Sequence, residues 1–149
     1  MLYETDFYAW TNQQAALLRA KGFHDADWEH IAEEIESMGK REKRELVNRL
    51  KVLLVHLLKW QRQPALRGRS WALTIKEQRK ELALHLLDNP SLKAELDRSM
   101  ADAYGIAVIR AEKETGLESF PASCPYGFQE VMDEEFWPGS AKSLDAHLP

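Results

Sequence analysis

Cysteine and long apolar runs are nearly absent from this chain of 149 residues. Cys124 is the only cysteine, which excludes an intramolecular disulfide and a metal centre with several thiolate ligands, and which fits a reducing cytoplasm. The longest apolar stretch, residues 52–58, is interrupted by His56 and is far shorter than the ~20 residues of a membrane span. The first ten residues lack a basic region followed by an apolar stretch, so no secretory signal is expected. These absences predict a cytoplasmic protein without a membrane-spanning segment.

Strand patterns are also absent, because no run alternates apolar and polar residues at a period of two for long enough to form a sheet. Apolar residues instead recur at helical spacing, and glycine or proline interrupts the pattern at intervals. The pattern predicts helices over residues 6–21, 25–39, 41–63, 70–88, 89–116 and 124–136. Such helices with short connections favour an all-α fold, a mostly antiparallel helical bundle of about five main helices plus a short C-terminal helix. We expect a single domain over residues 1–138, followed by a tail over residues 139–149.

Local signals define several of these boundaries. Thr5 is the expected N-cap of the first helix, and Ser70 that of the fourth. Gly39 is predicted to end the second helix and Gly116 the fifth. The apolar stripe of the second helix consists of Trp28, Ile31, Ile35 and Met38. The third helix is apolar nearly all round in its middle, which predicts a central helix packed on several sides.

Charge is segregated along the chain. Residues 1–39 contain 2 basic and 8 acidic residues, residues 40–80 contain 13 and 3, and residues 81–149 contain 5 and 13. The basic middle either faces a polyanion or is neutralised by the acidic helices on both sides. Nucleic-acid-binding domains are usually basic overall, whereas this chain has a net charge of −4. Internal neutralisation is therefore favoured over nucleic-acid binding.

Arg79 is a charged residue on an apolar helix face. At ~100° per residue it projects within about 60° of Ile75 and Leu82, and a buried guanidinium needs a partner. Glu34 lies at the edge of the stripe of the second helix, and His56 lies beside the stripe of the third. If these helices pack together, Glu34, His56 and Arg79 meet in the core. We favour a structural salt-bridge and hydrogen-bond network that fixes the order of the helices.

A metal or acid–base site is the alternative for the same region. Helical bundles build such sites from carboxylates and histidines on facing helices, and His30, Glu34 and His56 are the candidate ligands. The doubled Glu-x-x-His pattern of di-iron bundles is absent, because His30 and Glu33 have the reverse order and occur once. No metal and no cofactor is therefore expected.

The turn before the fourth predicted helix is rich in arginine. Arg62, Arg67, Arg69 and Ser70 surround the start of that helix. Free backbone N–H groups and the helix dipole favour an anion at this position. The glycine-rich phosphate loop with its lysine is missing, so nucleotide hydrolysis has no support. The turn is either a phosphate site or a solvated basic loop that pairs with nearby carboxylates.

Several short motifs are spread over nearly the whole chain up to Pro138. They are LYETDFYAW at 2–10, AEEIESMG at 32–39, HLLKWQ at 56–61 with Pro64, RSW at 69–71, ETG at 114–116, CPY at 124–126 and FWP at 136–138. In these motifs the chain resembles the bacterial domain-of-unknown-function family 29. The resemblance implies a bacterial, all-helical domain with no assigned activity, and the tail from Gly139 lies outside it.

The favoured function is a non-catalytic cytoplasmic helical interaction module that binds a protein partner or a second copy of itself. Phosphate or nucleic-acid binding through the basic residues 40–80 is the first alternative. A metal-dependent bundle enzyme that uses His30, Glu34 and His56 is the second. No membrane is expected among the partners.

Overall fold

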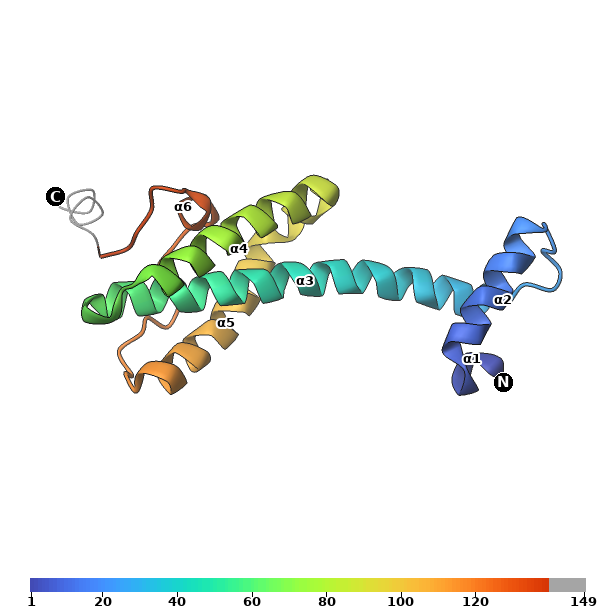
Figure 1. Cartoon of the computed structure of the whole chain (residues 1–149), viewed down its shortest axis with the longest axis horizontal. Coiled ribbons are helices and arrows are strands. Elements are labelled where there is room, and N and C mark those ends of the chain that lie inside the picture. Colours follow the sequence, from blue (N-terminus) through green and yellow to red (C-terminus); the bar gives the residue numbers. More distant parts are fainter. Residues whose placement is uncertain (140–149) are drawn as a thin grey trace. The chain divides into compact units, whose positions relative to one another are not determined.

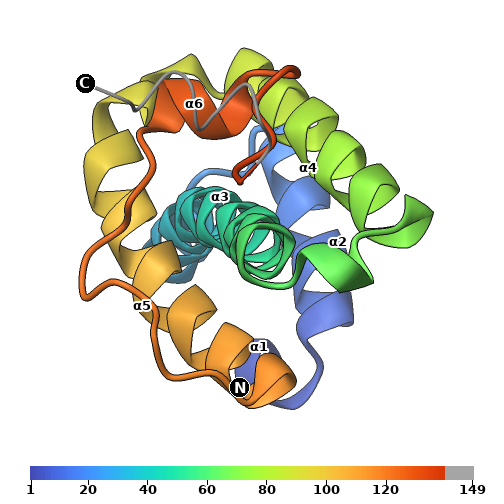
Figure 2. The same cartoon turned by 90° about the vertical axis from the view of Figure 1, so that its left-hand side faces the viewer.

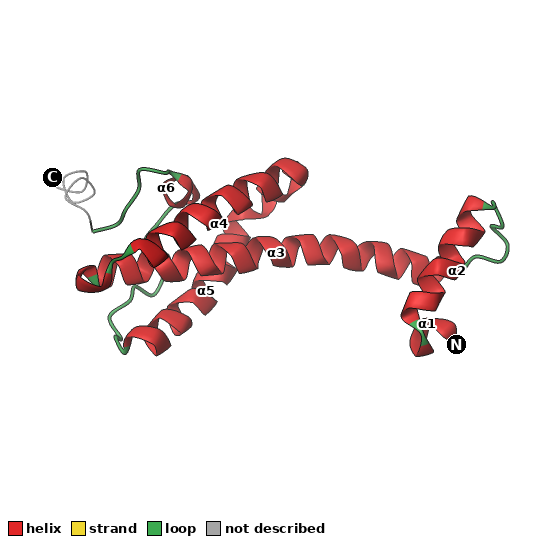
Figure 3. Cartoon of the chain, viewed as in Figure 1, coloured by secondary structure: helices red, strands yellow, loops and turns green. Residues whose placement is uncertain are grey.

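The computed structural model describes residues 1–139, and it is all-helical (Figures 1 and 3). The α-helices are α1 (Leu2–Thr5), α2 (Phe7–Arg19), α3 (Trp28–Arg62), α4 (Arg69–Asp88), α5 (Leu96–Thr115) and α6 (Phe128–Met132). Two 3₁₀ turns, η1 (Pro64–Leu66) and η2 (Pro90–Glu95), precede α4 and α5. No strand occurs among the described residues. The all-α prediction is confirmed.

The chain divides into two compact units, and the division falls inside α3. The N-terminal unit is Met1–Glu42 and the C-terminal unit is Lys43–Pro149, of which residues 43–139 are described. The single domain over residues 1–138 stays a prediction. Within residues 1–139, none of the helices combines the length and the hydropathy needed to cross a bilayer.

The N-terminal unit contains α1, α2 and the first part of α3. Asp6 caps α2, because its side chain accepts a hydrogen bond from the Ala9 backbone N–H at 3.0 Å. The predicted cap, Thr5, ends α1 instead, and its hydroxyl donates to the Met1 carbonyl. Asp27 precedes α3 and accepts from the His30 backbone N–H at 3.3 Å.

α3 is one helix where the sequence predicted two. It runs through Gly39, which was expected to stop the first of them. A glycine inside a helix costs only about 1 kcal/mol relative to alanine, and no proline or left-handed residue accompanies Gly39 to end the helix. The neighbouring Met38 and Lys40 are good helix formers, so the helix continues. The predicted number of main helices is therefore corrected.

The C-terminal unit is built around the last part of α3. Seen end-on, this helix lies among α4, α5 and α6 (Figure 2). The pattern predicted such a central helix, and its apolar side chains are at most 1% exposed: Leu46, Leu50, Leu53, Leu54, Val55, Leu57 and Leu58. Ile75 and Leu82 of α4, Ala103 and Ala107 of α5, and Val131 of α6 complete this core.

Some predicted boundaries of the C-terminal unit are correct and others are not. α5 ends at Gly116, which adopts a left-handed conformation with φ 74° as predicted. α4 begins at Arg69 with Gly68 as its N-cap, so Ser70 lies inside the first turn and is not the cap. The helix predicted over residues 124–136 shrinks to α6, because Gly127 and Asp133 are both extended. Residues 140–149 of the predicted tail lie outside the described residues.

Gly39→Ala should stabilise the protein by about 0.5–1 kcal/mol, because a Cβ at this helical position meets nothing within 4 Å. Urea unfolding monitored by circular dichroism measures the change. Gly116→Ala is the matched control, and it should destabilise because alanine is strained at φ +74°. A destabilising Gly39→Ala would show that α3 is interrupted at Gly39.

Candidate functional site

Among residues 43–139, Arg79 is the most deeply buried charged side chain. It lies on the apolar face of α4 with Ile75 and Leu82, and it is only 4% exposed. Its Nε donates to the Val131 carbonyl at 2.7 Å, and its Nη2 donates to the Phe136 carbonyl at 2.6 Å. Arg79 thus binds main-chain carbonyl oxygens, where the sequence suggested Glu34 and His56.

The guanidinium of Arg79 is held in one orientation. Its carbon lies 5.3 Å from the centre of the Trp137 ring, a cation–π contact. Burial lowers the pKa of Arg79, and the nearby charges of Asp133 and Glu134 oppose this shift. Because arginine is effectively always protonated in proteins, the side chain stays charged at neutral pH. One donor, Nη1, is buried and has no hydrogen-bond partner in the described part of the chain.

A pocket of about 310 Å³ opens beside Arg79. The described residues that line it are Lys76, Arg79 and Lys80 of α4 and Glu134, which follows α6. Sequence reasoning singled out Arg79 but missed the two lysines. Their spacing of four residues, with Arg79 between them, was a signal that one side of α4 carries three cations. Glu134 joins them only through the fold, so no local pattern could have indicated it.

In the structure of residues 1–139, some basic residues in the segment 40–80 form ion pairs with carboxylates, and others do not. Lys43 pairs with Glu95 at 3.4 Å, and Lys59 pairs with Glu114 at 3.0 Å. Arg49 contacts Glu45 and Glu81 at 2.7 and 3.7 Å. Part of the basic segment is therefore neutralised inside the unit, as the charge pattern favours. Lys76 and Lys80 have no ion pair among the described residues.

Glu34 belongs to a polar and aromatic cluster of the N-terminal unit. It accepts a hydrogen bond from the Tyr3 hydroxyl at 2.5 Å. This bond raises the pKa of Tyr3 to about 12. The Tyr3 ring stacks on His30 with centroids 4.0 Å apart, and His30 Nδ1 lies 2.6 Å from the Asp27 carboxylate. Tyr3 of α1 thus contacts both Glu34 and His30 of α3, and Asp27, which precedes α3, contacts His30.

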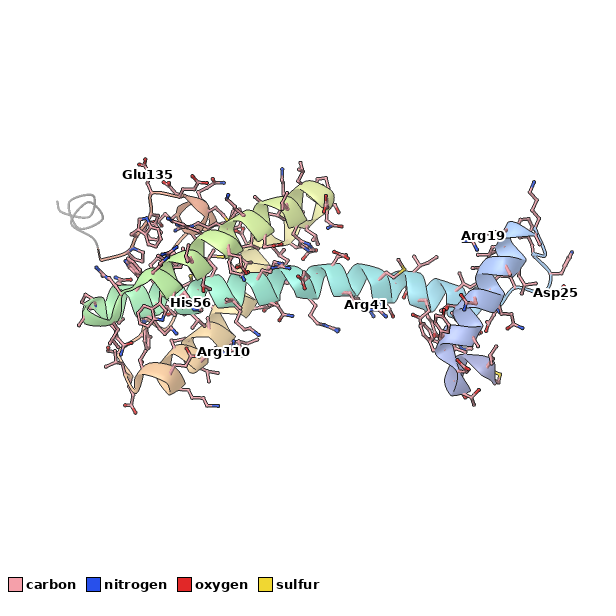
Figure 4. All side chains as sticks on the ribbon, in the orientation of Figure 1. Arg19, Asp25, Arg41, His56, Arg110 and Glu135 are labelled. Carbon is pink, nitrogen blue, oxygen red and sulfur yellow. The ribbon has the colours of Figure 1, made fainter. Side chains whose placement is uncertain are left out.

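His56 is a half-buried residue whose ring contacts the main chain of its own helix. It lies on α3 in the C-terminal unit (Figure 4), and its Nδ1 is 2.8 Å from the Val52 carbonyl one turn earlier. Burial lowers the pKa of His56, so the ring is neutral at neutral pH. Within residues 1–139 no group of three or more histidine, cysteine, aspartate or glutamate side chains is placed to hold a metal ion. The metal role of His30, Glu34 and His56 stays a hypothesis.

The arginine-rich turn is partly occupied by contacts within the protein. Arg67 Nε donates to the Trp60 carbonyl at 2.6 Å, and Nη2 donates to the Pro138 carbonyl at 3.3 Å. Arg62 lies over the Phe120 ring at 5.8 Å. Arg69 and Ser70 are exposed in the first turn of α4. Arg67 thus connects the end of α3 to the segment after α6 through hydrogen bonds. Binding of an anion by Arg62, Arg67, Arg69 and Ser70 stays a prediction.

An apolar helix face of the N-terminal unit is exposed. Trp28, Ile35 and Met38 are 50%, 63% and 59% exposed, and Ile31 is half-buried. We call these four residues the α3 apolar face, because they lie within about 80° of one another on the helix. The sequence correctly groups them as one stripe. The sequence does not indicate that most of this stripe is exposed to solvent.

A family model described as "Domain of unknown function DUF29" matches residues 2–137. The chain belongs to this family. The match covers α1 to α6 and the residues that line the pocket, in agreement with the resemblance found in the sequence motifs. No curated protein and no solved structure matches the chain. Membership of DUF29 brings no assigned activity.

Replacing Arg79 by methionine should lower the free energy of unfolding of this DUF29 chain by about 2–4 kcal/mol. The substitution leaves the Val131 and Phe136 carbonyls without their charged donor, and hydrogen bonds to charged groups contribute about 1.5–3 kcal/mol each. Urea denaturation measures the loss. Arg98→Met, at an exposed position of α5, is the control and should change stability by less than about 0.5 kcal/mol. Equal effects at the two positions would show that the carbonyl contacts contribute nothing.

The His30–Asp27 contact should make the stability of the N-terminal unit depend on pH. Their hydrogen bond raises the pKa of His30 above 6.5 and lowers the pKa of Asp27 below 3.8. The His30 contribution is complete below pH 6.5 and is lost as pH rises through the raised pKa. The Asp27 contribution is present above pH 3.8 and is lost as pH falls through the lowered pKa.

Thermal unfolding followed by tryptophan fluorescence should therefore show a decline in melting temperature as pH rises above 6.5. His30→Gln should remove this decline. His24→Gln, which changes an exposed histidine of the same unit, should leave the profile as it is. An unchanged decline in His30→Gln would assign the pH dependence to another group.

Proposed function

We propose that this chain is a non-catalytic interaction module whose N-terminal unit binds a basic amphipathic helix of a partner protein. The observation that carries the proposal is the exposed α3 apolar face. In the N-terminal unit, only one apolar side chain, that of Trp10, is buried. Phe7, Tyr8 and the residues of the α3 apolar face give this unit far more exposed than buried apolar surface. Concentrated exposed apolar surface is typical of protein interaction sites.

The spacing of the α3 apolar face favours a helix as the occupant. Trp28, Ile31, Ile35 and Met38 follow one another at intervals of three, four and three residues. This is the 3.5-residue period of a helix that packs along another helix. Recognition of amphipathic helices uses anchors at the same spacing. A single partner helix lying along α3 can therefore cover all four residues.

The charges beside the α3 apolar face favour a basic partner. By helical periodicity, Glu29 and Glu36 lie along one edge of the face, and Asp27 and Glu34 lie along the other. Residues 1–39 carry 8 acidic and only 2 basic residues. A partner helix with lysine or arginine beside its apolar stripe complements this pattern. A second copy would bring the same acidic edges together, and an anionic membrane would repel them, so both are less favourable occupants.

A synthetic helical peptide with leucine along one face and lysine along both edges tests the proposal. It should bind the whole protein, as measured by calorimetry. The same peptide with glutamate in place of lysine should bind much more weakly. Ile35→Gln with Met38→Gln should weaken binding of the lysine peptide by at least about tenfold, because burial of two such side chains contributes about 3 kcal/mol or more.

The matched control replaces Ile106 and Ile109 of α5 by glutamine. These isoleucines are 50% and 65% exposed, so the control removes similar exposed apolar surface from the other unit. It should leave binding within about twofold. Equal weakening in both double variants, or equal binding of the two peptides, contradicts the proposal. A concentration-dependent dimer that Ile35→Gln with Met38→Gln abolishes would identify a second copy as the occupant, and would overturn the assignment to a partner helix.

A further inference from the structure

The pocket beside Arg79 belongs to the C-terminal unit and has a different chemistry from the α3 apolar face. Of the lining side chains that belong to the described residues, Lys76, Arg79 and Lys80 are cations and Glu134 is an anion. We propose that this pocket binds the phosphate group of a small, hydroxylated phosphomonoester. This site is distinct from the arginine-rich turn, and it does not depend on the interaction proposed for the N-terminal unit.

The charge of the pocket matches a dianion. Within the described part of the lining, Lys76, Arg79 and Lys80 together with Glu134 leave two positive charges, and a phosphomonoester carries about −1.5 to −2 at pH 7. Lys43, Arg49 and Lys59 of the same basic segment have carboxylate partners, whereas Lys76 and Lys80 have no ion pair among the described residues. The two lysines are exposed, one turn apart on α4, and available to a ligand.

Arg79 gives the pocket a fixed, buried donor group. Two carbonyl bonds and the Trp137 ring hold its guanidinium, so a ligand does not have to order this side chain on binding. Nη1 is the nitrogen of this group that has no acceptor among residues 1–139. Buried donors are normally paired, and Arg79 is a lining residue of the pocket, so a ligand acceptor is the partner that we infer for this donor. A phosphate oxygen is a strong acceptor for arginine.

Glu134 and the pocket volume further restrict the chemical class and the size of the proposed ligand. A carboxylate can only accept hydrogen bonds, so in a site for an anion it suits a hydroxyl group of the same ligand. The volume of about 310 Å³ lies at the lower end of the range for small-molecule sites. These features favour a short polyol or sugar phosphate over inorganic phosphate, which offers no alcohol hydroxyl.

Calorimetry with the full chain and glycerol 3-phosphate tests the site. Lys76→Gln with Lys80→Gln should weaken binding by about tenfold or more, because charge-assisted contacts to phosphate are lost. Both lysines are exposed, so this variant should retain the circular dichroism spectrum of the wild type. The control, Lys93→Gln with Lys113→Gln, removes the same charge from exposed positions outside the pocket and should stay within about twofold.

Glu134→Gln, titrated with glycerol 3-phosphate and with inorganic phosphate, separates the hydroxyl contact from the phosphate contacts. The wild type should prefer the ester, and the preference should decrease in the variant, because the amide keeps one acceptor oxygen but lacks the negative charge of the carboxylate. Equal weakening by the two lysine pairs would show a general charge effect and overturn the site. Absence of binding by the wild type would also overturn it. An unchanged preference in Glu134→Gln would remove Glu134 from ligand selection.

Discussion

The C-terminal unit depends on the burial of the last part of α3. Five leucines of this helix, Leu46, Leu50, Leu53, Leu54 and Leu57, have no exposed surface. Complete burial of each such side chain contributes about 1.5–3 kcal/mol, so their removal from water outweighs any single polar contact of the unit. Packing against these leucines places α4, α5 and α6, and with them every polar contact that shapes the pocket. The position of the Arg79 guanidinium is a consequence of this arrangement.

Helical periodicity predicts which residues share a face, but it does not predict what covers that face. The same kind of pattern occurs in both parts of α3. Leu46 and Leu50 are fully buried, whereas Ile35 and Met38 are mostly exposed. The difference arises from the helices packed against each part, and this depends on tertiary contacts that are not encoded at the level of one helix. Sequence reasoning therefore identified the stripe of residues 28–38 and missed its exposure.

The local signals of the sequence differ in how firmly they determine structure. Gly116 ends α5 because a left-handed residue follows the last turn, whereas Gly39 lacks that conformation and is absorbed into α3. The position of Arg79 on an apolar face was readable from spacing alone. Its partners were not, because the carbonyls of Val131 and Phe136 are main-chain atoms, and any amino acid supplies the same acceptor. The lining of the pocket could not be predicted from the sequence either, because Glu134 comes close to α4 only in the folded chain.

The use of main-chain acceptors has a consequence for how this region can vary. Arg79 donates hydrogen bonds to two main-chain carbonyls that are five residues apart. These two bonds therefore depend on the length and course of the backbone between the carbonyls, and not on the identity of most side chains in that segment. Met132, Asp133 and Glu135 can be exchanged without removing either acceptor. An insertion or deletion between Val131 and Phe136 displaces one carbonyl from the guanidinium whatever residues are chosen. The length of this segment is therefore constrained more strictly than its composition.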